Sequence, residues 1–199
     1  VLNPGEMAMP DATAVIARLS ENKEYEKLFA EAFPGENQPM NYDNFGRAVA
    51  AFERTLITHD RYDDFVKGDD KALAAAEMKG LETFINTGCI ACHTGSFFGG
   101  HMYQKMGLVN AYDTKDLGRF EVTKNEGDKF FFKVPSLRNI ALTAPYFHDG
   151  KATELEDAVR KMGWHQLGKK LTDDEVKSIV TFLRTLSDKE RGAKKTASR

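Results

Sequence analysis

The strongest constraint in this sequence is its only two cysteines, which stand three positions apart and directly before a histidine. The segment reads Cys89-Ile90-Ala91-Cys92-His93, the C-x-x-C-H pattern of c-type haem attachment. Two thiols about one helical turn apart can reach the two vinyl groups at one edge of a porphyrin, and the histidine then lies under the iron as its proximal ligand. The pattern therefore predicts one covalently attached haem c, held by Cys89, Cys92 and His93.

Two other uses of a C-x-x-C pair fit the sequence less well. A thioredoxin-like redox pair favours a βαβ context, which the flanking segments do not have. A structural zinc site needs a second Cys/His pair, and the chain has no further cysteine. A thiol or zinc-binding interaction domain is thus the weakest of three functional hypotheses. A haem enzyme and a plain electron-transfer cytochrome are the other two.

Composition excludes several other classes of protein. Hydrophobic residues make up 41% and charged residues 29% of the 199 residues, as in ordinary globular chains. No apolar run approaches the roughly 18 residues that a membrane helix needs. A formal net charge of −2 gives no general attraction to nucleic acid. We therefore expect no membrane span and no nucleic-acid partner.

Apolar residues recur at helical spacing in most of the chain, which predicts a mainly α fold in which helices surround the haem of a c-type cytochrome domain. The expected helices are 11–19, 21–33, 41–58, one capped by Asp69 or Asp70 and running to about residue 86, 153–162 with Gly163 as its stop, and one that follows a capping-box pattern at 172–175. Residues 95–129 are rich in glycine and have few helical stripes. For these residues we expect loops with at most a short hairpin.

The sixth ligand of the iron must come from a distant segment, on the opposite face of the haem. A methionine there would raise the reduction potential and suit electron transfer, whereas an open position would suit oxygen or peroxide chemistry. Met162 ends an expected helix, although its apolar stripe equally fits a core methionine. His148, in the turn at 146–150, is the second candidate. Spacing alone leaves both open.

Longer stretches around the motif resemble the second haem domain of bacterial dihaem cytochrome c peroxidases. The matching stretches are FINTGCIACHTG (84–95) with the glycines at 99–100, FKVPSLRN (132–139) and LTAPYFHDG (142–150), while AVAAFERTLIT (48–58) matches the helix before that domain. The resemblance runs from about Asn3 to Leu186. It implies an enzyme that reduces hydrogen peroxide to water with electrons from a small cytochrome c or a cupredoxin.

The resemblance also implies roles for individual residues. The second-domain haem of this family is the high-potential, electron-accepting one, and its His and Met axial ligands match His93 and Met162. A related branch that oxidises protein tryptophans has a tyrosine at the Met162 position, so this sequence argues against that activity. Glu6 matches the catalytic glutamate of the peroxide pocket, where a carboxylate could shuttle protons. Family members bind calcium between the haems, and the backbone carbonyls of Thr143 and Pro145 match two of its ligands.

The sequence departs from the family in one respect, because the family carries a first C-x-x-C-H in an N-terminal, peroxide-reducing domain. This chain has a single such motif. We therefore expect the C-terminal portion of a longer enzyme with a second haem, and a natural single-haem electron-transfer cytochrome is the alternative. Residues 1–68 would belong to or pack on the missing domain, 69–186 would form the haem domain, and 187–199 would be a basic flexible tail.

Two further expectations concern location and assembly. C-type haem is attached outside the cytoplasm in bacteria, so we expect an exported, periplasmic protein. A homodimer is the one assembly that we consider for this chain.

Overall fold

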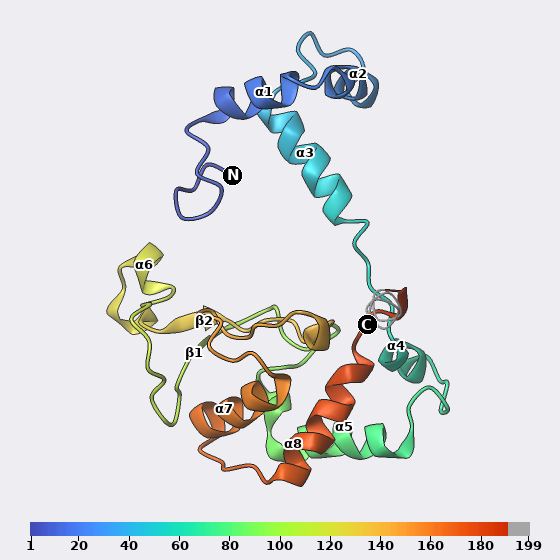
Figure 1. Ribbon diagram of the computed structural model, residues 1–199, viewed down its shortest axis with the longest axis vertical. Coiled ribbons are helices and arrows are strands. Elements are labelled where there is room, and N and C mark those ends of the chain that lie inside the picture. Colours follow the sequence, from blue (N-terminus) through green and yellow to red (C-terminus); the bar gives the residue numbers. More distant parts are fainter. Residues whose placement is uncertain (191–199) are drawn as a thin grey trace. The chain divides into compact units, whose positions relative to one another are not determined.

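The computed structural model describes residues 1–190, and the chain divides into two compact units, one of Val1–Ile57 and one that begins at Thr58 (Figure 1). The sequence predicted a boundary after residue 68. Residues 58–68 instead belong to the second unit, where the amide of His59 donates to the carboxylate of Asp188 at 3.0 Å. The amide of Lys189 donates in turn to the His59 carbonyl at 3.0 Å. Within residues 1–190, no helix is long and apolar enough to cross a membrane.

The first unit contains three helices, α1 (Ala12–Ser20), α2 (Lys23–Ala32) and α3 (Tyr42–Glu53). Each begins after an Asp or Asn whose side chain accepts a hydrogen bond from a backbone amide of the first turn. Asn44 is almost fully buried, and its side-chain amide donates to Glu36 and to the carbonyl of Pro39, both at 2.8 Å. These bonds fix the loop between α2 and α3. The third helix ends at Glu53, before the predicted residue 58, and the chain continues there in a turn.

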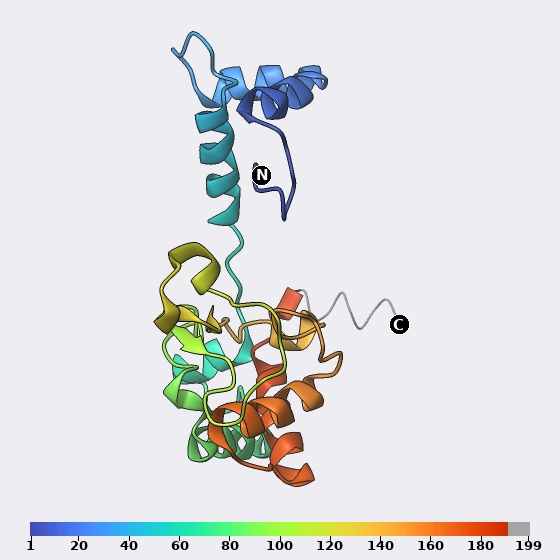
Figure 2. The same cartoon turned by 90° about the vertical axis from the view of Figure 1, so that its left-hand side faces the viewer.

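The second unit is built on helices that pack together, with short turns and strands between them (Figure 1, Figure 2). The longer helices are α5 (Ala75–Thr87), α7 (Leu155–Leu167) and α8 (Asp173–Thr185). The shorter elements are α4 (Arg61–Val66), α6 (Phe120–Thr123), η1 (Cys89–Ala91), η2 (Glu126–Asp128) and η3 (Ile140–Leu142). Strands β1 (Tyr103–Lys105) and β2 (Phe131–Lys133) form one antiparallel pair. The prediction of a mainly α fold with at most a short hairpin is confirmed.

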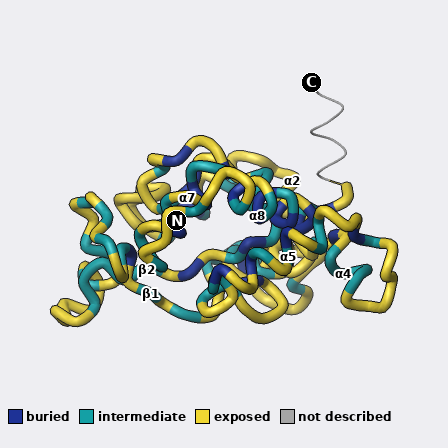
Figure 3. The backbone as a smooth tube through the Cα atoms, turned by 90° about the horizontal axis from the view of Figure 1, so that it is seen from below, coloured by how far each residue is buried: buried dark blue, intermediate teal, exposed yellow. Residues whose placement is uncertain are grey.

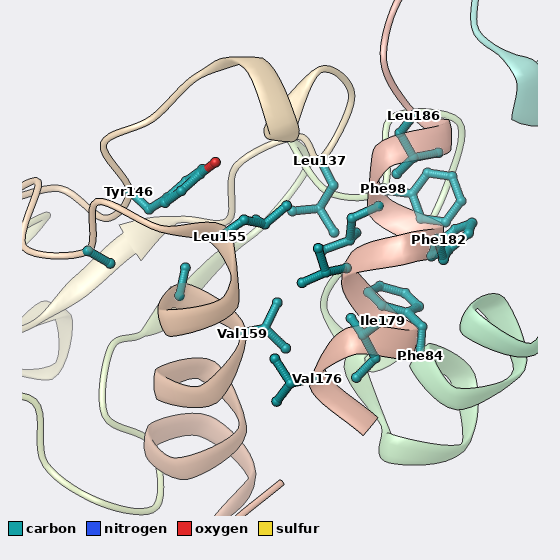
Figure 4. Close-up of a cluster of buried hydrophobic side chains, with 14 residues drawn as sticks. Phe84, Phe98, Leu137, Tyr146, Leu155, Val159, Val176, Ile179, Phe182 and Leu186 are labelled. Carbon is teal, nitrogen blue, oxygen red and sulfur yellow. The ribbon is translucent and has the colours of Figure 1, made fainter. Parts of the chain in front are cut away.

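The core lies where α5, α7 and α8 meet, and the buried segments in Figure 3 gather around α5 and α8. Gly80 lets α5 and α8 approach closely, because a Cβ built on it would lie 2.2 Å from the carbonyl oxygen of Ser178. Beside this contact the rings of Phe84 and Phe182 lie 5.5 Å apart, and Val159 of α7 completes the cluster (Figure 4). This crossing holds the end of α5, and thus the segment that follows it, against the core.

Two helix boundaries differ from the sequence prediction for reasons the structure makes clear. The fifth helix begins at Ala75, because the side chain of Asp69 accepts the amide of Lys71 in a local turn instead of capping a helix. Helix α7 continues through Gly163 to Leu167 and is ended by Gly168, whose φ is +67°. Gly163 is required for packing instead, since a Cβ there would lie 2.8 Å from Cγ of Leu171.

The C-terminal end of the described chain is anchored to the second unit. Asp188 is buried, and its amide donates to the side chain of Asn139 at 2.7 Å. The predicted basic tail therefore begins with residues that are part of the fold. Residues 191–199 of that tail lie outside the described residues.

Candidate haem site

The C-x-x-C-H motif follows directly on the end of α5. Gly88 caps this helix with a φ of +104°, a backbone conformation that glycine adopts without steric cost. The chain then makes a single 3₁₀ turn, in which the amides of Cys92 and His93 both donate to the carbonyl of Cys89, at 3.3 and 3.0 Å. The two cysteines are thus one turn apart, as the sequence predicted.

His93 is oriented by backbone carbonyls. Its Nδ1 lies 3.2 Å from the carbonyl oxygen of Phe98 and can donate its proton there, which leaves Nε2 with the lone pair that binds a metal. Burial lowers the pKa of His93, opposed by the carbonyls of Phe98 and Pro135, so the neutral imidazole is favoured. A neutral imidazole with its lone pair on Nε2 is the form that ligates haem iron.

The two thiols are partly buried and not joined in a disulfide. Burial raises the pKa of Cys89 to about 11, so this thiol stays protonated at neutral pH, while the nearby charge of Lys169 acts in the opposite direction. The side-chain amide of Gln104 in β1 lies 3.9 Å from Sγ of Cys92. Within residues 1–190, no three His, Cys, Asp or Glu side chains converge as they would around a single metal ion. The donor set fits a haem, with two attachment thiols and one axial imidazole.

The loop that orients His93 is held by a buried ion pair. Asp60 is fully buried, and its carboxylate accepts the Asp63 amide at 3.0 Å and Nη1 of Arg138 at 2.5 Å. The same guanidinium pairs with Asp63 at 3.0 Å and donates to the carbonyl of Ser96 at 2.8 and 2.9 Å. Arg138 therefore connects α4 to the segment that carries the Phe98 carbonyl.

Met162 lies half-buried on α7, one turn beyond the buried Val159. Gln166, four residues later on the same face, accepts the amide of Leu108 at 2.9 Å and donates to the carbonyl of Lys105 at 3.1 Å. Since the neighbour of Lys105 is Gln104, which contacts Cys92, strand β1 joins this face of α7 to the motif. Ligation of the iron by Met162 stays a prediction.

The second candidate for the sixth ligand is already engaged at one ring nitrogen. Nε2 of His148 lies 3.0 Å from the hydroxyl of Thr114, and its ring stacks on Phe132 with centroids 4.0 Å apart. These contacts hold the turn at 146–150 against the loop that contains Thr114 and against β2. Ligation of the iron by His148 likewise stays a prediction.

The remaining predicted site residues lie elsewhere. Glu6 is exposed in an N-terminal turn of the first unit, whereas the motif belongs to the second unit. Thr143 and Pro145 are exposed and follow η3. The residues that the sequence analysis missed are Phe98 and Pro135, which act through backbone carbonyls, so their side-chain types carry no signal for the role.

A C-x-x-C-H turn at the end of a helix that crosses α8, whose histidine has its Nδ1 beside a backbone carbonyl, is the arrangement of a c-type cytochrome domain. A family model described as cytochrome c matches residues 77–187, and one described as di-haem cytochrome c peroxidase matches residues 1–71. The chain belongs to the cytochrome c family, whose model matches more than half of it, and its first 71 residues are similar to the di-haem cytochrome c peroxidases. Both families imply haem c as the cofactor.

Relatives with curated names agree with this family. The chain is 49% identical to cytochrome c551 peroxidase of Pseudomonas aeruginosa, over 84% of this chain and 50% of the relative. It is 43% identical to cytochrome c551 peroxidase of Nitrosomonas europaea, over 94% of this chain and 56% of the relative. For cytochrome c peroxidase Ccp of Escherichia coli the identity is 41%, over 94% of this chain and 41% of the relative. The chain thus spans about half the length of the curated relatives that it matches.

Solved structures show the same fold. A MauG-like protein associated with microbial copper homeostasis superposes with a TM-score of 0.75 at 27% identity, over 89% of this chain and 62% of that structure. A variant of the diheme peroxidase BthA from Burkholderia thailandensis has a TM-score of 0.75 at 21% identity, over 94% of this chain and 61% of that structure, which supports the fold alone.

Proposed function

We propose that this chain supplies the electron-accepting haem c of a periplasmic cytochrome c peroxidase, which reduces hydrogen peroxide to water. The electrons would come from a small cytochrome c or a cupredoxin. The observation that carries the proposal is the C-x-x-C-H turn with its oriented, neutral His93, in a chain that is 41–49% identical to proteins named cytochrome c peroxidase.

In this proposal four residues hold the haem. Cys89 and Cys92 form the thioether bonds, His93 supplies the proximal ligand through Nε2, and Met162 supplies the distal ligand. When bound, haem provides a one-electron iron couple whose potential a methionine ligand raises. In the chain itself, burial favours neutral His93, whose Nδ1 is oriented by the carbonyl of Phe98, and the side-chain amide of Gln104 lies beside Sγ of Cys92.

The peroxide-reducing haem would lie in a separate N-terminal domain. The relatives are long enough to contain one, because this chain spans only about half of their length. We assign the first unit to that domain or to its surface. Exposed apolar side chains on and just after α3 support this assignment, since a face of this kind usually packs on a partner. They are Val49, Phe52, Leu56 and Ile57.

Glu6 and the turn after η3 complete the proposed machinery. Glu6 would move protons in the peroxide pocket, which suits an exposed carboxylate on the first unit. The carbonyls of Thr143 and Pro145 would bind calcium, because both residues are exposed and oxygen ligands suit a hard cation.

Peroxide turnover with reduced cytochrome c tests whether this chain only accepts electrons while another domain reduces peroxide. We expect the isolated chain, loaded with haem, to accept electrons from reduced cytochrome c without rapid peroxide turnover. Stopped-flow oxidation of the donor, with and without peroxide, measures both steps. Rapid turnover by this chain alone would contradict the proposed place of the peroxidatic centre, and an absence of covalent haem would contradict the proposal as a whole.

The identity of the distal ligand is tested by Met162→His. We expect the haem potential to fall and the Met–iron charge-transfer band to disappear, because imidazole stabilises the oxidised iron better than a thioether does. Near-infrared absorption and a redox titration measure the two effects. Met106→Leu is the control, since Met106 is a buried methionine of the neighbouring loop and should leave the band intact. An unchanged band in Met162→His would assign the sixth position to another residue.

A further inference from the structure

Lys169 places a positive charge at the end of the helix that carries the haem motif. Its Nζ donates to the carbonyl of Thr87 at 2.8 Å, and Thr87 is the last residue of α5, two positions before Cys89. The ammonium group therefore lies at the helix end from which the turn of Cys89–Ala91 starts.

The backbone directs this side chain. Gly168 ends α7 in the left-handed region with a φ of +67°, and the next amide, that of Lys169, donates to the carbonyl of Gly163 at 2.8 Å. The turn therefore presents Lys169 to the end of α5 across 82 positions of sequence. This placement depends on the packing of α7 and does not follow from helical periodicity.

The positive charge of Lys169 favours reduction of a haem bound next to the end of α5. The carbonyl end of a helix carries partial negative charge, which disfavours an added electron nearby, and a lysine there offsets it. Haem iron becomes less positive by one unit when it is reduced. A fixed positive charge close to the haem therefore stabilises the reduced form relative to the oxidised form.

We infer that Lys169 raises the reduction potential of the haem attached at Cys89 and Cys92, and that it acts through the end of α5 without touching a reactant. The inference rests on the proposed function, in which this haem accepts electrons. It adds to the distal ligand a second contribution to the high potential, supplied by the turn after α7.

Two neighbouring charged groups bear on the inference. The charge of Lys169 also acts on Glu175, but that carboxylate is held by the amide and hydroxyl of Thr172, at 2.8 and 2.9 Å. Lys170 lies over the ring of Trp164, 5.5 Å from its centroid. Lys170 is therefore the matched control, with the same charge one position away but a different contact.

The experiment compares four variants of the haem-loaded chain by spectroelectrochemical titration. Lys169→Gln removes the charge and keeps a donor for Thr87, Lys169→Met removes both, Lys169→Arg keeps both, and Lys170→Gln removes the control charge. For the Gln and Met variants we expect the ratio of reduced to oxidised haem, at a fixed electrode potential, to fall about fivefold. A change of this order is expected for the loss of one unit charge that solvent partly screens. Lys169→Arg and Lys170→Gln should stay near the parent ratio.

Several results would overturn the inference. They are an unchanged ratio in Lys169→Gln, an equal fall in Lys170→Gln, or a fall in Lys169→Met alone, which would assign the effect to the hydrogen bond. A pyridine haemochrome assay on each sample separates this failure from failure of the proposed function, because it reports covalent haem whatever the potential. Thermal melts by circular dichroism identify a variant that is only less stable, and the Lys169→Arg variant then tests for restored potential.

Discussion

Replacing Cys89 and Cys92 together by serine is expected to abolish covalent haem in this chain. Serine has nearly the same volume, but its hydroxyl forms no thioether with a vinyl group, so any haem that still binds is held by the axial ligands alone. Acidified organic solvent should then extract it from the double variant and leave it bound in the parent protein. The pyridine haemochrome spectrum of the protein fraction measures the difference.

The single cysteine variants and a neighbouring residue sharpen this experiment. Cys89→Ser and Cys92→Ser should each lower the yield of covalent haem, and what forms should absorb at longer wavelength because one vinyl group stays conjugated. Gln104→Ala is the control, since this side chain lies 3.9 Å from Sγ of Cys92 but its amide cannot form a thioether with a vinyl group. Normal covalent haem in the double variant would refute the thioether assignment and reopen the thiol and zinc hypotheses.

Arg138→Met is expected to destabilise the haem-binding unit by about 3–5 kcal/mol, the usual cost of removing one partner of a buried ion pair. The variant leaves the carboxylate of Asp60 fully buried without the guanidinium that it pairs with at 2.5 Å. It also frees the carbonyl of Ser96, which Arg138 holds in the loop before Phe98. Urea unfolding followed by circular dichroism measures the loss in free energy.

Arg160→Met is the matched control for this stability prediction. Arg160 pairs with Asp173 at 2.6 Å, but the two side chains are 44% and 78% exposed. An exposed pair of this kind contributes about 0–1 kcal/mol, so this variant should unfold near the parent midpoint. Adding Asp60→Asn to Arg138→Met should recover part of the lost stability, because it removes the unpaired buried charge. A loss in Arg138→Met no larger than that in Arg160→Met would show that the buried pair does not support this unit.

Much of the fold could be predicted from local sequence, since local interactions dictate it. The capping box that begins α8 at Thr172 is confirmed, because its hydrogen bonds join residues only three apart. Helical periodicity likewise located α1, α2 and the start of α7 to within two residues. Gly163 misled the prediction, since it lies inside α7 to admit Leu171, a contact that periodicity cannot reveal.

The sequence by itself determined that Cys89, Cys92 and His93 have the C-x-x-C-H spacing, because that spacing is a local property of the chain, and it predicted their role in haem attachment. Only the tertiary structure decided how the His93 ring is oriented and which charged group lies beside the motif. The carbonyls of Phe98 and Pro135 contact His93, and burial of its ring favours the neutral imidazole. Lys169, which follows α7, donates to the last carbonyl of α5. Backbone carbonyls look alike at every residue, so their selection and the long-range placement of a charge depend on how the helices pack.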